Sequence, residues 1–438
     1  MAPVTCMFRL NKALSMTLLG LCVSCSSSLF HDYPDDAWRG LDAFEHGDFD
    51  TAANEFLLLN GTLDGNEFLS FAEAGMAYHV GGNLKAATEE WLQAVQVLDG
   101  YGDRPTISGR SLSEGALSML INDKTIPYDG EGFEAVLLHG FLAWDFLRLG
   151  SLEGALVEVK RGYEFEQFEE ERFGTTYGMN RFARFVAAIA QELDGQLQDA
   201  RLDLNRLAEE IPDHPAVVYS LARLQRLTSS ERGQERAVSE IVIVYERGRM
   251  PQKVAHELNY STTRSIGKLS VPGFGTPPFA HAAISVKVGE QDLGKTVTIE
   301  DVLAVGETNL KDRIGWATAK AIARSIGKTI VVDEVAKAAE EKNGPWAGIL
   351  VSITGSLWNN FSERADLRSW LTLPAEIQVL RAAVPSGEQR VILSSGPDGH
   401  QLDLGILSFE PGKPVLIGVR AVGGRLYADS QTPVVNRP

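Results

Sequence analysis

Cysteine is scarce in this chain of 438 residues, which has only Cys6, Cys22 and Cys25. All three lie at the N-terminal end, around a short apolar run at 13–23, and the rest of the sequence has none. The sequence after Cys25 therefore has no disulfide bridges, no thiolate metal ligands and no cysteine nucleophile, so its stability has to come from packing. The position of the three cysteines favours a role in targeting over a role in catalysis.

Concentrated positive charge is also lacking. The chain has 41 Lys and Arg residues against 58 Asp and Glu residues, a formal net charge of −17 at pH 7. Arginines gather only between 223 and 236, where they alternate with glutamates and are typical of a solvated helix face. Nucleic acids and anionic lipid surfaces are bound through concentrated Lys and Arg, so both are disfavoured as partners.

Hydrophobic runs long enough to cross a bilayer are lacking too, since such a run needs about 20 residues. The run at 13–23 follows Arg9 and Lys12, and this order of a basic and then a short apolar segment predicts an export signal. A second apolar stretch, 346–358, is also too short to span a bilayer. We expect it to be a buried core element, and the alternative is an inserted hairpin or a partner-docking segment.

The sequence "CVSC" at 22–25 resembles a bacterial lipobox, with Ser24 before Cys25. Cys22 departs from the pattern, in which leucine is usual at that position. The resemblance implies that 1–24 is removed as a signal peptide and that Cys25 becomes a lipidated N-terminus, with palmitate among its acyl chains. Acylation with more than one chain anchors a protein stably in a membrane. The alternative is ordinary secretion, with cleavage near Ser24 and a free cysteine.

The residue after the lipobox carries sorting information. Ser26 stands there instead of aspartate, which resembles the outer-membrane sorting pattern. The resemblance therefore implies a lipid-anchored linker at 25–34 and an outer-membrane protein that faces the periplasm.

The first half of the chain repeats a pattern of two helices joined by a glycine turn. Apolar and small residues recur at helical spacing on both sides of each turn. Four copies are present, at 37–57, 71–95, 137–165 and 182–217. Their small residues, their aromatic residues and the prolines that end the fourth copy resemble the tetratricopeptide repeat. The resemblance implies a helical repeat domain over 35–232, built as a curved stack with a concave binding surface.

From about residue 237 the pattern changes to short apolar runs that are typical of strands. The continuous apolar run at 241–244 predicts a strand. Ile284, Val286 and Val288 alternate with polar residues, which predicts a strand with one buried face.

A helix is predicted over 308–342, and four further strand-like runs follow within 376–422, joined by turns that contain proline and glycine. The sequence therefore predicts an α+β domain over 233–438. We expect an antiparallel sheet or small sandwich at its end, with one or two helices packed on it.

The decapeptide ADLRSWLTLP at 365–374 stands in this C-terminal half. Together with "RGRMPQK" (247–253), "ALVEVKR" (155–161) and the stretch 122–128, it makes the chain resemble a group of bacterial lipoproteins. In that group, tetratricopeptide-like helices precede a mixed domain with an "aDxRsW-tLP" signature. The resemblance spans nearly the whole chain after the signal, and it implies no activity.

Asp366, Arg368 and Trp370 are the first candidate contact residues. In an extended segment they alternate onto one face, so we expect Asp366 and Arg368 to form a bidentate ion pair beside the indole. The interpretation we favour is a structural clamp that pins the segment to the sheet. The alternative is contact with a ligand or partner.

Trp144, Glu158 and Arg161 are the candidate contact residues of the helical half. Glu158 and Arg161 are three positions apart, which makes them neighbours on one helix. With Trp144 close by, they would line the groove of the stack. The favoured interpretation is again structural, and contact with a partner is the alternative.

Sequence motifs of catalysis and metal binding are lacking. "ARSIGKT" (323–329) ends like a phosphate-binding loop, but Ile322 replaces the earlier glycine that lets backbone N–H groups hold phosphate. The eight histidines form no His-Glu-x-x-His motif, and no Gly-x-Ser-x-Gly sequence is present. We therefore predict no catalytic residue, no metal ligand and no cofactor.

The sequence as a whole predicts an exported outer-membrane lipoprotein that recruits or scaffolds other envelope proteins, in cell-wall synthesis, secretion or surface assembly. Partners would bind in the groove of the helical repeats, and the lipid would hold the protein at the membrane. A second hypothesis is a periplasmic binding module for a small molecule or glycan, with its site near Trp370. A third is a hydrolase whose site is assembled in space.

Overall fold

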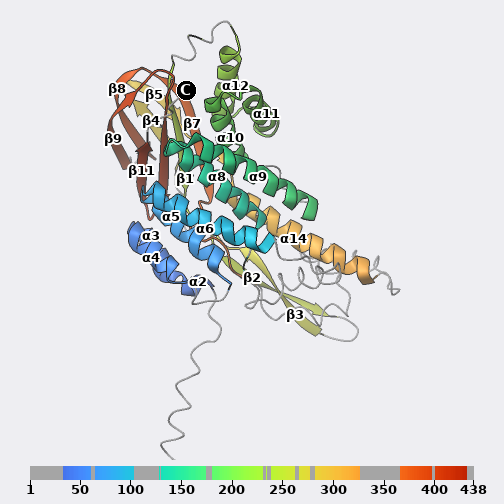
Figure 1. Cartoon of the computed structure of the whole chain (residues 1–438). Helices are drawn as coiled ribbons and strands as arrows, with labels where there is room; N and C mark the ends of the chain where they lie inside the picture. Colours follow the sequence, from blue (N-terminus) through green and yellow to red (C-terminus); the bar gives the residue numbers. More distant parts are fainter. Residues whose placement is uncertain are drawn as a thin grey trace, which may run out of the picture.

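The computed structural model describes the chain in these ranges: 33–60, 65–102, 128, 130–173, 180–229, 233, 238–261, 266–276, 282–325, 366–396 and 400–431. Helices fill the N-terminal part and strands fill most of the C-terminal part (Figure 1). The mixed fold class expected from the sequence is therefore confirmed at this level. The expected signal segment 1–24, the lipid site Cys25, the linker up to residue 32 and the apolar run 346–358 lie outside the described residues.

The helices follow one another as pairs, after the single turn α2 (Tyr33–Asp36). The members of each pair pack on each other, and the pairs are α3 (Trp38–His46) with α4 (Phe49–Leu57), α5 (Glu67–Val80) with α6 (Leu84–Gly102), α8 (Gly132–Arg148) with α9 (Leu152–Phe173), and α10 (Arg181–Asp194) with α11 (Leu197–Glu210). The helix α12 (Pro215–Leu227) comes next. The four predicted helix–turn–helix units are therefore confirmed.

A glycine with a left-handed backbone lies in the turn of each pair. These glycines adopt positive φ angles at little cost because they lack a Cβ atom, and they are Gly47 (82°), Gly82 (80°), Gly150 (75°) and Gly195 (85°). Glycine also sets the distance between α5 and α6. A Cβ atom on Gly75 would lie 2.3 Å from Cδ1 of Trp91, so a larger residue there would separate the two helices.

The helices pack on a five-stranded sheet, whose strand order is β11-β10-β1-β7-β6. Its strands are β1 (Ser239–Arg247), β6 (Val297–Glu300), β7 (Glu376–Val384), β10 (Pro414–Val422) and β11 (Arg425–Gln431). The central strand β1 contains the predicted run at 241–244 and is buried over nearly its whole length. β1 pairs parallel with β10, whereas the other pairs are antiparallel. The antiparallel pairing expected from the sequence therefore prevails, and the parallel pair is an exception that was not predicted, because no hairpin fixes the relative direction of two strands so far apart in sequence.

A four-stranded antiparallel sheet has the order β5-β4-β8-β9. Its strands are β4 (Ile284–Val288), β5 (Gln291–Lys295), β8 (Gly387–Ser395) and β9 (His400–Phe409). In β4 the side chains of Ile284, Val286 and Val288 are buried and alternate with more exposed ones, as predicted. The predicted turn after β7 carries the chain from the first sheet to the second.

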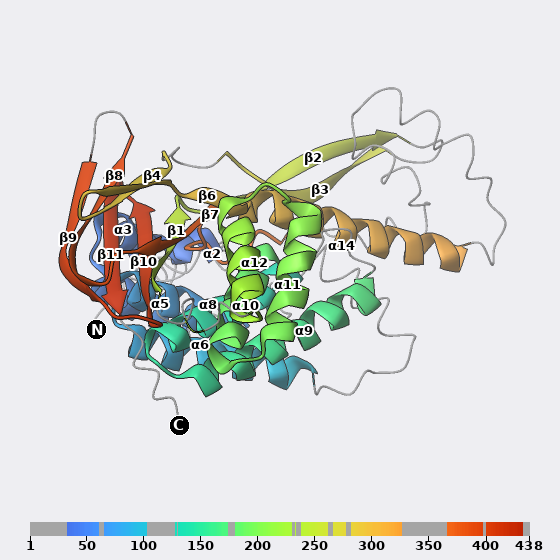
Figure 2. The same cartoon turned by 90° about the horizontal axis from the view of Figure 1, so that it is seen from above.

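A hairpin and a long helix extend together away from the two sheets (Figure 2). The hairpin consists of β2 (Lys253–Ser261) and β3 (Ile266–Phe274), and the helix is α14 (Val302–Ser325). The hairpin was not predicted, because β3 contains Pro272 and two glycines, which are depleted in strands. The helix begins at Val302 instead of the expected 308, and residues 326–342 of the predicted helix lie outside the described residues.

The five-stranded sheet is the middle layer of the molecule (Figure 2). One of its faces, with Val242 and Val244, belongs to the same hydrophobic cluster as the helices. The opposite face, with Ile241 and Ile243, forms a second cluster with β4, β8 and β9. Within the helical half, α5, α8, α10 and α12 therefore contact the sheet directly.

Candidate functional site

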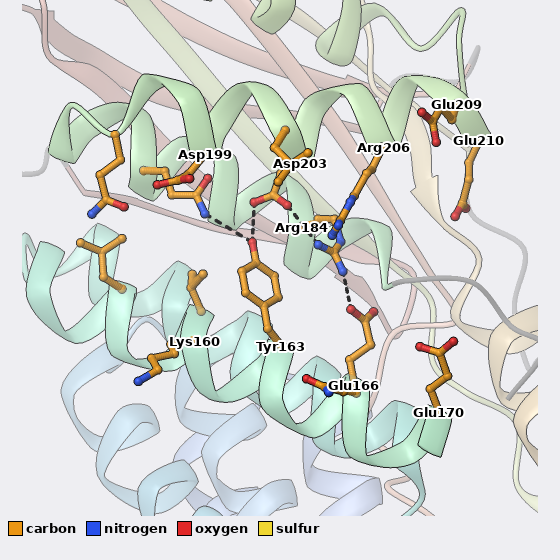
Figure 3. Close-up of a pocket in the computed structure, with 16 residues that line it drawn as sticks. Lys160, Tyr163, Glu166, Glu170, Arg184, Asp199, Asp203, Arg206, Glu209 and Glu210 are labelled. Carbon is orange, nitrogen blue, oxygen red and sulfur yellow. Dashed lines mark hydrogen bonds and ion pairs between the residues drawn. The ribbon is translucent and has the colours of Figure 1, made fainter. Parts of the chain in front are cut away.

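An open groove lies between α9 and α11, and α10 contributes to its floor (Figure 3). Its volume is about 1030 Å³. The lining mixes apolar, amide and charged side chains and comprises Leu156, Val159, Lys160, Tyr163, Glu166, Gln167, Glu170, Arg184, Gln191, Gln196, Asp199, Leu202, Asp203, Arg206, Glu209 and Glu210. Within each helix these residues recur at three- and four-residue steps, so each helix presents one face to the groove.

A hydrogen-bond network crosses the floor of the groove and joins the three helices. The Tyr163 hydroxyl on α9 donates to Oδ2 of Asp203 on α11, at 2.5 Å. Arg184 on α10 donates to Oδ1 of Asp203 at 3.0 Å and also to Glu166 on α9. The Arg184 guanidinium carbon also lies 4.8 Å from the centroid of the Tyr163 ring. Because the contacts connect separate helices, they fix the width of the groove before anything binds.

Burial and neighbouring charges set the protonation of this floor. Burial and the Asp203 carboxylate raise the pKa of Tyr163, so its hydroxyl stays neutral and remains a donor. Burial lowers the pKa of Arg184, but the Glu166 and Asp203 carboxylates outweigh this and raise it overall. The floor therefore keeps its hydrogen bonds across the physiological pH range.

The signature segment, here the described residues 366–374, contains the predicted ion pair. Arg368 Nε lies 3.0 Å and 3.1 Å from the two carboxylate oxygens of Asp366, and Arg368 Nη2 lies 2.7 Å from Oδ2. The bidentate geometry expected from the sequence is therefore present. The aromatic ring under the Arg368 guanidinium is that of Tyr128, whose centroid lies 5.2 Å away.

Trp370 does not lie at the surface, since only 1% of it is exposed. Its ring packs edge-on against Phe68, Trp91 and Phe141, with centroid distances of 6.4, 6.3 and 6.5 Å. Its indole N–H donates to the hydroxyl of Thr372. A glycan needs an exposed ring face on which to stack, so the buried indole does not offer the site expected near Trp370.

Buried side chains hold the backbone of the signature segment. Glu134 accepts the N–H of Trp370 at 2.8 Å, and Glu73 accepts the N–H groups of Leu371 and Thr372 at 2.5 and 2.9 Å. Burial raises the pKa of Glu73 to about 7, although the hydrogen bonds from Thr372 and the backbone oppose the shift. These contacts hold the segment on α5 and α8, which was not expected, while the expected contact with the sheet comes from Arg420 on β10, which donates to the Thr372 carbonyl at 2.7 Å.

The candidate contact residues of the helical half, Trp144, Glu158 and Arg161, have structural contacts within the fold. Glu158 is buried, accepts a hydrogen bond from Nδ1 of His139 at 2.7 Å and lies 3.4 Å from Nη1 of Arg161. The expected pairing of Glu158 with Arg161 is therefore present, but neither residue lines the groove between α9 and α11. Trp144 is fully buried and belongs to the core.

A buried network of charged side chains connects the helices to the five-stranded sheet, and no sequence motif predicted it. His79 on α5 contacts Asp145 on α8 at 2.8 Å and Glu246 on β1 at 2.7 Å. Glu246 in turn pairs with Arg420 on β10 at 3.0 Å. Burial lowers the pKa of His79, but the two carboxylates outweigh burial and raise it to about 9.

A second buried cluster lies between α10, α12 and the sheet. Arg381 on β7 donates to both carboxylate oxygens of Glu192 at 2.9 Å and lies 3.3 Å from Glu240. Arg223 on α12 contacts the same two carboxylates at 2.7 and 2.9 Å. Two cations and two carboxylates therefore share one buried site.

The groove residues were also missed from the sequence. Tyr163, Arg184 and Asp203 come from three different helices and converge only when these pack. A usable signal was the recurrence of acidic residues on one helical face, as at Glu166 and Glu170.

Within the described ranges, His, Cys, Asp and Glu residues form no group of three or more that would hold a metal ion. The helices of these ranges also lack the length and apolar content that a bilayer crossing requires. Comparisons of the chain with models of protein families, with curated proteins and with solved structures give no match. The groove between α9 and α11 is therefore identified from its own geometry.

Proposed function

We propose that this protein is an exported, non-catalytic scaffold of the bacterial envelope whose groove between α9 and α11 holds a segment of a partner protein. The observation that carries the proposal is the groove itself, with its volume of about 1030 Å³ and its floor fixed by buried hydrogen bonds. A preformed site loses little conformational entropy when a partner binds. The groove also combines apolar anchors with polar residues, as helix-based peptide sites do.

The finer architecture in this proposal is a tetratricopeptide-like stack on a β-sandwich. The four helix pairs with glycine in their turns support the first part. The second hydrophobic cluster, which joins the two sheets, supports the second part. In such a stack, neighbouring pairs supply the walls of a groove and the floor between them.

The anchor in this proposal is a lipid on Cys25, which places the protein at the outer membrane and facing the periplasm. Its support is the lipobox-like "CVSC" at 22–25 and the short apolar run before it. The test is treatment with globomycin, together with a Cys25→Ala variant. The precursor is expected to accumulate, and the variant is expected to leave the membrane fraction. A precursor that matures normally under globomycin would exclude the lipid anchor.

The groove is tested with a photo-crosslinking amino acid at Leu202, which lines it and is 52% exposed. The matched control is Val218 on α12, which is 51% exposed and outside the groove. In cells, irradiation is expected to give a discrete protein adduct at Leu202 and none at Val218. Equal labelling at the two positions, or no adduct at Leu202, would contradict a partner-binding groove.

A small-molecule binding module remains the second candidate, because the groove volume also matches that of ligand pockets. The discriminating measurement is native mass spectrometry of the protein purified from its own envelope. A bound compound of defined mass that is lost on substitution of Tyr163 favours the binding module. A protein adduct at Leu202 without such a compound favours the scaffold.

A further inference from the structure

The groove between α9 and α11 has more negative than positive charge. Its lining has three cations, on Lys160, Arg184 and Arg206. Against these stand six carboxylates, on Glu166, Glu170, Asp199, Asp203, Glu209 and Glu210. The excess is local, so it acts on whatever enters the groove more strongly than the diffuse charge of the whole chain does.

Two of the three cations have carboxylate partners, and only those of Arg184 belong to the groove lining. Arg184 donates to both Glu166 and Asp203, and its side chain is nearly buried. Lys160 lies 3.7 Å from Glu164 on its own helix. Among the described residues no cation is paired with Glu170 or Glu209, which lie exposed on the two rims. The rims therefore offer carboxylates that are free to bind a cation.

The negative charge is concentrated at one end of the groove. Figure 3 shows that α9 and α11 run in the same direction, from Lys160 to Glu170 and from Asp199 to Glu210. The C-terminal halves of both helices thus lie at the same end, and helix C-termini carry partial negative charge that favours cations. The apolar lining residues Leu156, Val159 and Leu202 belong to the opposite, N-terminal halves.

The floor also has an acceptor without a donor. Gln191 lines the groove and is 5% exposed, and its Nε2 lies 3.4 Å from the Tyr163 hydroxyl. Its Oε1 has no hydrogen-bond donor among the described residues. Because Gln191 contacts Tyr163 and not the rim carboxylates, this oxygen needs an N–H donor of its own from an occupant, separate from the cations at the rims.

We propose, on the basis of the proposed function, that the groove binds a partner segment with apolar residues at one end and lysine or arginine residues at the other. The apolar end lies against Leu156, Val159 and Leu202. The cationic end lies between Glu170 and Glu209. Exposed charge pairs are individually weak, so the apolar end supplies affinity and the cationic end fixes direction.

The test uses fluorescein-labelled synthetic peptides with leucines at one end and lysines at the other, measured by fluorescence anisotropy on the whole mature chain. The lysine peptide is expected to bind, and a peptide with glutamate in place of lysine is not. A Glu170→Gln/Glu209→Gln double variant is expected to weaken binding about fivefold to tenfold at low salt. The matched control is Glu153→Gln/Asp213→Asn, which removes the same charge from α9 and from the turn after α11, outside the groove lining.

Three results would overturn the inference: equal affinity of the two double variants, binding of the glutamate peptide, or binding of spermidine as tightly as the lysine peptide. The last result would assign the charge to a small polycation instead of a protein segment. The cellular adduct at Leu202 separates the two proposals. An adduct that persists unchanged in the Glu170→Gln/Glu209→Gln variant contradicts the cationic segment but not the scaffold. Absence of any adduct in the chain that keeps both glutamates contradicts the scaffold itself.

Discussion

The helix–sheet interface and the groove between α9 and α11 use the same residue types in opposite ways. At the interface, the carboxylates of Asp145, Glu246, Glu192 and Glu240 are almost completely buried, and each meets at least one cation. In the groove, carboxylates outnumber cations, and those on the rims are open to solvent.

The difference follows from the cost of removing a charge from water. An unpaired buried charge costs several kcal/mol, so the interface retains its charges only as closed networks. An exposed carboxylate stays solvated and costs little, so the groove tolerates an excess. Position, and not residue type, therefore separates the charges that hold this fold together from those that are available to a partner.

The largest expected effect comes from opening a buried network. Arg381→Met leaves the Glu192 and Glu240 carboxylates with Arg223 alone, and we expect the free energy of unfolding to fall by about 3–5 kcal/mol in urea titrations. Arg390 on β8 is the matched control, because it forms a similar pair with Asp403 in solvent. Arg390→Met is expected to leave stability nearly unchanged. Equal losses in the two variants would remove the distinction between the regions.

The pH dependence of stability tests the network around His79. Its pKa is about 9 in the folded chain and near its ordinary value of 6.5 when unfolded, so the folded state binds the proton more tightly. The stabilisation is complete below pH 6.5 and is lost as pH rises through 9, a change of about 3 kcal/mol. Urea titrations at pH 6 and pH 9.5 measure it. His79→Gln is expected to remove this part of the pH dependence, and the exposed His46→Gln is expected to keep it.

Removal of one carboxylate from the clamp should have a smaller effect. Glu73→Gln leaves an amide where two backbone N–H groups and the Thr372 hydroxyl donate, and its own NH₂ then faces donors. We expect a loss of about 1–3 kcal/mol in thermal unfolding. The exposed Glu89→Gln on α6 serves as control and should change nothing. An unchanged melting temperature in Glu73→Gln would mean that the clamp does not hold the signature segment.

The smallest effects are expected in the groove, and they separate its floor from its rim. Tyr163→Phe removes the hydrogen bond to Asp203 but keeps the ring, so we expect a loss of about 1 kcal/mol. Glu170→Gln on the rim should leave stability unchanged, since its side chain is solvated. Chemical unfolding of both variants checks this order. A rim variant that destabilises more than Tyr163→Phe would show that the rim charges are structural.

Much of the fold was predictable because it depends on local patterns. Glycine turns and apolar spacing identified all four helix pairs, and the continuous apolar run at 241–244 identified the strand β1. The parallel pairing of β1 with β10 and the hairpin of β2 and β3 were not predictable. The first depends on strands that are distant in sequence, and the second contains residues that are unfavourable in strands.

The candidate residues show the same limit. The ion pair of Asp366 and Arg368 was predictable because the two residues are two positions apart. The burial of Trp370 was not, because it depends on Phe68, Trp91 and Phe141 from three distant helices. The groove was missed for the same reason, since its floor combines residues from α9, α10 and α11.

The helix pairs of the N-terminal half, the alternation in β4, the negative charge and the lack of cysteine beyond residue 25 can be read from the sequence, because each is a property of neighbouring residues or of composition. The packing of the elements determines which charges are buried in pairs and which are exposed in a groove. Burial depends on which elements pack together. Because desolvation of an unpaired charge is costly, buried charges occur in pairs that belong to the fold, whereas exposed charges are available for recognition.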